Sequence, residues 1–227
     1  MKTIKIDIHT NGYSFMLVFM TLFVNYSFAQ NLDLKSFTTI SIYTGEEANE
    51  AELRIAGLLR DRLMEHSKVK VDLKKMPLNV DGKELVILFG RSDHSREIRN
   101  QFEKSRISPL TDLAPGPEGF LLRWMDDRVL LAAGIDDRGC LYAVGELLRQ
   151  TTWDEDRILL PAELNIRTAP AFEIRGTQYG QSHVAKNLAK VRDWTEEETQ
   201  RVILDYALAG ANIFSTDVGP MFDFIKS

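Results

Sequence analysis

The stretch Glu84-Leu85-Val86-Ile87-Leu88-Phe89-Gly90 decides the fold. Its near-continuous apolar run ends at a glycine, a pattern that is typical of a central strand buried on both faces. Such strands occur in sheets that carry helices on both sides. The run therefore predicts an α/β domain around residues 84–90.

The residues before this run supply two more strands and a helix. Phe37–Tyr43 and Val69–Leu73 are rich in β-formers and predict strands. Glu46–Glu65 has helical periodicity. Its apolar stripe comprises Ala51, Ile55, Leu58, Leu59 and Leu63. The order strand, helix, strand fits the same domain.

The residues after the run complete the prediction. The expected elements are a helix from Ser92 or Asp93 to about Lys104, a hairpin of Glu118–Met125 and Arg128–Ala133, a helix from Asp136 or Asp137 to about Gln150, and Ile158–Pro161 as a short edge strand at most. The predicted fold class is α/β, a small α/β sandwich with a mixed sheet over residues 30–167.

A second unit is expected over residues 168–227. After a linker at Thr168–Ala171, Phe172–Gly176 predicts a strand that ends at its glycine. Thr195 and Glu198 form a capping box for a helix that ends near Gly210, and Asn212–Ser215 predicts the next strand. This order favours the first βα units of a (β/α)8 TIM barrel. The barrel would be truncated, because a closed one takes about 250 residues, far more than residues 168–227 supply.

Composition excludes several classes of protein. The 227 residues carry a formal net charge of -5, which argues against a nucleic-acid partner. The single cysteine, Cys140, excludes an internal disulfide framework and a multi-cysteine zinc site. The four histidines show no metal-ligand spacing. We therefore expect no metal and no cofactor.

The first 29 residues predict a signal peptide. Lys2 and Lys5 precede the apolar run Phe15–Val24, and Ser27 and Ala29 are the small residues of a cleavage site. The run is shorter than the about 20 residues that cross a bilayer. We expect an exported protein, periplasmic or extracellular, with no membrane span after cleavage.

Two motifs carry a resemblance to a known group of enzymes. Ile135–Leu148 resembles the last helix of the small α/β domain that precedes the catalytic barrel in bacterial β-hexosaminidases and α-glucuronidases. Ala169–Gly176 resembles the entrance to that barrel, a proline, an aromatic residue and then Arg-Gly. The resemblance extends over most of the chain from about Phe37, although only these two motifs are specific.

The resemblance implies a glycoside hydrolase that uses carboxylates on later strands, so no catalytic residue is assigned. It also implies that Arg175 binds hydroxyls of the terminal sugar, at the carboxyl end of the first strand. The alternative is an arginine that pairs with Asp or Glu across the interdomain seam. Gln178 and Tyr179 follow in the same predicted loop and are candidates to line the pocket, with core packing or loop anchoring as the alternative.

Other chemistry-bearing residues have simpler interpretations. Asp136-Asp137 fits a helix cap, and Asp126-Asp127 fits a turn. Cys140 fits a small core residue rather than a nucleophile. His183 lies in the predicted loop, where a solvated histidine is favoured over a substrate contact.

The leading hypothesis is therefore the N-terminal portion of an exported glycoside hydrolase. Its carbohydrate substrate would carry O-glycosidic bonds of the N-acetylhexosaminide or glucuronide type, and the remainder of its own barrel would be its partner. The alternative is a non-catalytic carbohydrate-binding or interaction module.

Overall fold

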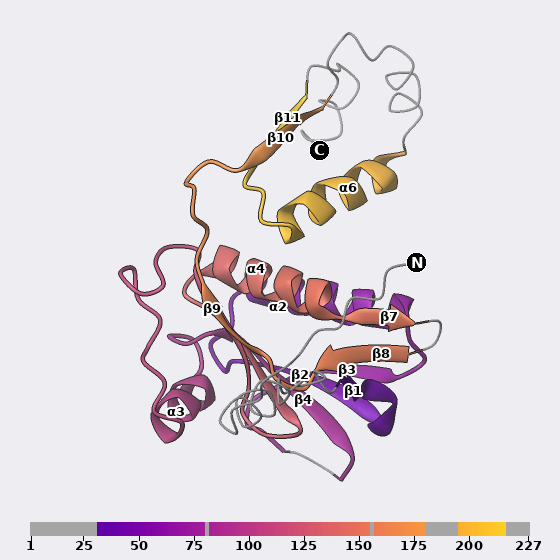
Figure 1. Cartoon of the computed structure of the whole chain (residues 1–227), viewed down its shortest axis with the longest axis vertical. Coiled ribbons are helices and arrows are strands. Elements are labelled where there is room, and N and C mark those ends of the chain that lie inside the picture. The colour runs from indigo at the N-terminus through magenta and orange to yellow at the C-terminus, as the bar shows by residue number, and fades with distance from the viewer. Residues whose placement is uncertain (1–30, 80–81, 155–156, 180–194, 217–227) are drawn as a thin grey trace, which may run out of the picture. The chain divides into compact units, whose positions relative to one another are not determined.

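A computed structural model describes residues 31–79, 82–154, 157–179 and 195–216 (Figure 1). The helices there are α2 (Glu50–Glu65), α3 (Arg96–Lys104), α4 (Asp137–Gln150) and α6 (Glu196–Leu208). The strands there are β1 (Asn31–Asp33), β2 (Thr39–Thr44), β3 (Lys70–Lys75), β4 (Glu84–Arg91), β5 (Phe120–Trp124), β6 (Val129–Gly134), β7 (Thr152–Asp154), β8 (Arg157–Pro161), β9 (Asn165–Thr168), β10 (Gly176–Tyr179) and β11 (Ile213–Thr216). The expected signal peptide lies outside the described residues.

The main sheet has six strands in the order β3-β2-β4-β6-β5-β9. β4 runs parallel to both of its neighbours, β2 and β6, and β2 runs parallel to β3. β5 and β9 add two antiparallel pairings at the other side. The predicted mixed sheet is therefore confirmed, with the apolar run of residues 84–90 buried in β4.

Helices cover both faces of this sheet (Figure 1). Leu85, Ile87 and Phe89 of β4 belong to a core cluster that also holds side chains of α2 and α4. Val86 and Leu88 belong to a second cluster with Ile98 and Phe102 of α3. Successive strand residues point to opposite faces, so the apolar run fills both cores.

Side-chain caps set where the helices begin. α4 begins after Asp136, whose carboxylate accepts a hydrogen bond from Gly139 N at 2.7 Å, and α6 begins with the expected capping box at Thr195. The other two helices begin later than expected. α2 begins after Asn49 instead of at Glu46, and α3 after Ser95, because these side chains accept from the first-turn amides.

A second sheet corrects one expectation of the sequence. Ile158–Pro161 was expected at most as an edge strand, but β8 is the central strand of the order β1-β8-β7. The unexpected strand β1 pairs antiparallel with it, Leu32 opposite Leu160. Ile158 and Leu160 are buried in the core that α2 and α4 share.

The last described elements form a βαβ unit. β10 and β11 pair in parallel, with Thr177 opposite Phe214, and α6 connects them in the chain. β9 ends at Thr168, one residue past the expected domain boundary. The first strand of the unit was expected at Phe172–Gly176 but begins only at Gly176. A Cβ at Gly176 would lie 2.2 Å from the carbonyl oxygen of Ile213, so the glycine permits the close approach of β11.

α6 contacts α4 at another glycine. A Cβ at Gly145 would lie 1.8 Å from the carbonyl oxygen of Leu208, so no larger residue fits without a shift of the helices. Arg149 of α4 donates to the same carbonyl oxygen at 2.7 Å. The βαβ unit is thereby attached to the small α/β domain.

Candidate functional site

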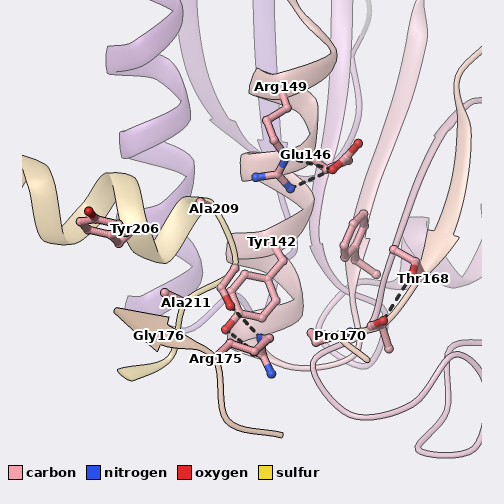
Figure 2. A pocket seen from close by; sticks show the side chains of 13 residues that line it. Tyr142, Glu146, Arg149, Thr168, Pro170, Arg175, Gly176, Tyr206, Ala209 and Ala211 are labelled. Carbon is pink, nitrogen blue, oxygen red and sulfur yellow. Dashed lines mark hydrogen bonds and ion pairs between the residues drawn. The ribbon is translucent and has the colours of Figure 1, made fainter. Parts of the chain in front are cut away.

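A cavity of about 430 Å³ lies where α4, the end of β9, the start of β10 and the end of α6 meet (Figure 2). Tyr142, Glu146 and Arg149 line it from α4, and Arg175 lines it from the segment before β10. Its volume is in the range of small-molecule pockets, about 300–1,000 Å³. The cavity is therefore large enough to hold a small ligand.

The carboxylate in this cavity is not poised for acid catalysis. Glu146 accepts hydrogen bonds from Arg149 at 2.8 Å and from Gln150 at 2.7 Å. Desolvation raises the pKa of Glu146, but these hydrogen bonds and the charge of Arg149 outweigh it, so the net pKa is lowered. A general acid of a glycosidase needs a raised pKa. Glu146 therefore acts here as an acceptor within α4.

Arg175 is the most connected side chain of the cavity. Its Nη2 donates to the carboxylate of Glu118 and to the hydroxyl of Tyr142, the latter at 2.8 Å. Its Nε donates to the carbonyl of Gly210 at 2.7 Å, and its Nη1 donates to the carbonyls of Phe172 and Glu173. A guanidinium has five N–H donors, and these contacts use all of them.

Glu118 is held between two arginines. Its carboxylate accepts from Arg138 at 2.6 Å and from Arg175, and its own backbone N–H donates to Asp136 at 3.0 Å. Partial burial raises the pKa of Glu118, but the hydrogen bonds and charges of Arg138 and Arg175 lower it by more. The carboxylate is therefore kept ionised beside the cavity.

A second polar cluster lies at the carboxyl end of β4. Glu52 of α2 is fully buried, and its carboxylate accepts from the backbone N–H groups of Asn49 at 3.0 Å and Arg91 at 2.8 Å. The Nδ1 of His94 lies 2.5 Å from the same carboxylate. Ligands of open α/β sheets bind at the carboxyl ends of the strands. Here the carboxylate of Glu52 itself accepts from the backbone N–H groups at the start of α2 and the end of β4, where a ligand would otherwise bind.

The three residues that were expected to contact sugar lie at opposite ends of β10. Arg175 was expected at the carboxyl end of a strand; this position is wrong, because β10 begins at Gly176 and Arg175 precedes its amino end. The alternative of an ion pair across the seam is what the structure shows, with Glu118 as the partner. Gln178 and Tyr179 were expected in a loop but lie within β10, and their side chains are outside the described part.

The simpler interpretations of other residues have clear outcomes. The cap role of Asp136 is confirmed, and Asp126 accepts from the amides of Arg128 and Val129, which confirms a turn. Cys140 is fully buried, and burial raises the pKa of its thiol well above the ordinary value. His183 lies outside the described residues.

Sequence reasoning missed both carboxylates that organise these clusters. Glu118 was expected only as the first residue of the hairpin strand Glu118–Met125, and its arginine partners lie far along the chain. The expected apolar stripe of this helix does not include Glu52, so it did not predict that Glu52 is buried. A glutamate three residues after Asn49 is the one available signal, because that spacing is a capping box.

No group of three or more His, Cys, Asp or Glu side chains among the described residues is arranged to hold a metal ion. No helix in the described part of the chain is long and apolar enough to cross a membrane.

Comparison with known proteins finds similar proteins only among solved structures. No protein-family profile matches the sequence, and no curated protein matches it. Among solved structures, a GH115 4-O-methyl-α-glucuronidase, BtGH115A, is similar over 82% of this chain, with a TM-score of 0.57 and 15% identity. CpGH84D has a TM-score of 0.52 at 11% identity, and a GH20 exo-β-N-acetylglucosaminidase from Vibrio harveyi has 0.51 at 12%.

These likenesses confirm the resemblance at the level of the fold. Each match covers 82% of this chain, a share that residues 1–168 alone could not supply, so it extends into the segment that carries the βαβ unit. This chain spans only 23 to 28% of the length of those proteins. The chain therefore has the fold of a part of these glycoside hydrolases.

Proposed function

We propose that this chain is the N-terminal portion of an exported glycoside hydrolase, in which residues 30–167 brace the barrel and residues 168–227 begin it. One observation carries the proposal: the likeness to glycoside hydrolases extends beyond the small domain, into the segment that holds the parallel β10–α6–β11 unit. A parallel βαβ unit is the repeating element of a TIM barrel.

The proposed substrate is an oligosaccharide or glycoconjugate with an N-acetylhexosaminide or glucuronide bond. The solved structures with this fold include enzymes whose names carry both activities, an exo-β-N-acetylglucosaminidase and a 4-O-methyl-α-glucuronidase. The catalytic carboxylates belong to later strands in this proposal.

Gln178 and Tyr179 are the proposed sugar contacts within this chain. They are the last two residues of β10, and the active sites of TIM barrels lie at the carboxyl ends of the strands. Arg175 as a sugar contact stays a prediction. Its place at the amino end of β10 and its five protein acceptors count against that role.

Activity measurements test the proposal. The purified 227-residue chain is expected to show no hydrolysis of aryl N-acetylglucosaminides or aryl glucuronides. A longer product of the same gene, with further βα units after Ser227, is expected to hydrolyse one of the two classes. Turnover by the short chain would contradict the assignment of the catalytic carboxylates to later strands.

The alternative of a carbohydrate-binding module has its own signature. Titration calorimetry of the 227-residue chain with glycans would show specific binding, and the gene would encode no further βα units. That pair of results would replace the hydrolase proposal with the module.

A further inference from the structure

The side chain of Arg175 connects the start of β10 to the small domain. Its guanidinium donates to Glu118, which precedes β5, and to the hydroxyl of Tyr142 on α4. The guanidinium carbon also lies 5.3 Å from the centre of the Tyr142 ring, within the distance of a cation–π contact. Figure 2 shows Arg175 beside Tyr142 at the wall of the cavity.

The same residue connects to the turn between α6 and β11. Its Nε donates to the carbonyl of Gly210 at 2.7 Å. Its own carbonyl accepts from the amides of Asn212 at 2.8 Å and Ile213 at 3.0 Å, and its amide donates to the side chain of Asn212 at 2.9 Å. One residue thus contacts the small domain, the start of β10 and the start of β11.

We propose that Arg175 is a positioning residue that fixes the amino ends of β10 and β11 to α4. The two strands have 4 residues each, and a two-stranded sheet of that size is marginal by itself. Its first pairs therefore need support from outside the sheet. A planar guanidinium with five donors supplies it, because one group reaches acceptors from three segments at once.

α6 has attachments that do not involve Arg175. Arg62 of α2 lies 2.5 Å from Asp205, and Arg201 lies 3.2 Å from Glu65. Gly145 and Arg149 of α4 contact the carbonyl of Leu208. A variant at Arg175 is therefore expected to remain folded and to release only the amino ends of β10 and β11.

Amide hydrogen exchange of the full chain tests this role. The amides of Asn212 and Ile213 are the probes, because both donate to the carbonyl of Arg175. Arg175→Gln is expected to accelerate their exchange about 10- to 100-fold, the equivalent of losing charged hydrogen bonds. Amides of β4 and α6 are expected to keep their wild-type rates.

Two variants make the test specific. Arg138→Gln removes the other arginine of Glu118, but Arg138 and Glu118 both belong to the small domain, so the probes are expected to exchange as in the wild type. Arg175→Lys keeps the charge but loses the planar fork, so it is expected to restore little of the protection.

Several results would overturn the proposal. These are unchanged exchange of the probes in Arg175→Gln, equal acceleration in Arg138→Gln, full rescue by lysine, or acceleration that spreads equally through α6 and β4. None of these results depends on glycosidase activity, so the proposal and the proposed function stand or fall separately.

Discussion

Glu118 shows how one side chain serves two elements. Its carboxylate neutralises Arg138 at the start of α4 and Arg175 before β10. The pair with Arg175 is largely shielded from solvent, since both side chains are less than a fifth exposed. Removing one partner of a shielded ion pair leaves the other charge uncompensated, which costs more than the loss of an exposed pair.

The lowered pKa of Glu118 gives a pH dependence with a definite sign. A group whose pKa is lower in the folded state contributes stability above its unfolded pKa, about 4.3 for glutamate. This contribution is lost as the pH falls through the lowered pKa of the folded protein. Glu118→Gln is therefore expected to be less stable than the wild type at pH 7, by about 1–3 kcal/mol.

Urea unfolding of both proteins between pH 3 and pH 7 measures this dependence. The difference in the free energy of unfolding is expected to shrink as the pH falls below about 4.3, where the carboxylate of the unfolded chain becomes protonated, and to vanish below the lowered pKa of the folded protein. A difference that stays constant over the whole range would show that ionisation of Glu118 contributes nothing.

At the scale of elements, the sequence pattern predicted the features that neighbouring residues determine. The central place of β4 followed from its near-continuous apolar run, because a strand between two helical layers needs apolar residues on both faces. The starts of α4 and α6 followed from Asp136 and Thr195, because a cap acts within its own turn.

The sequence pattern did not predict the features that depend on residues far apart in the chain. Phe172 and Ile174 suit a strand but are 74% and 73% exposed, because β10 begins only where Gly176 can pair with Ile213. β8 is central because Asn31–Asp33, which has no strand pattern, pairs with it. The sequence allowed an ion pair of Arg175 across the interdomain seam. It did not identify Glu118 as the partner, because the two residues are 57 positions apart in the chain.

Two glycines test the contact between α4 and α6. At Gly145 a methyl group would collide with the carbonyl of Leu208, so Gly145→Ala is expected to destabilise the chain by about 1–3 kcal/mol. Gly57 of α2 has open space around it, so Gly57→Ala is the matched control and is expected to stabilise by about 0.5–1 kcal/mol.

Thermal unfolding of both variants gives the comparison. A Gly145→Ala protein as stable as Gly57→Ala would mean that α6 does not lie against α4 at this point.

At the scale of the whole chain, two sheets and a βαβ unit share one supporting helix. α4 fills the core beneath the main sheet, and its other side carries Gly145, Arg149 and Tyr142 toward the βαβ unit. Parallel strands as short as β10 and β11 gain little stability by themselves. The small domain therefore supports the start of what we propose to be a barrel.

Interstrand nuclear Overhauser contacts in the 227-residue chain test this central claim most directly. The account predicts contacts of a parallel register with Thr177 opposite Phe214, together with contacts between Gly145 and Leu208. Random-coil chemical shifts for residues 176–179 and 213–216, or contacts of an antiparallel register, would contradict it.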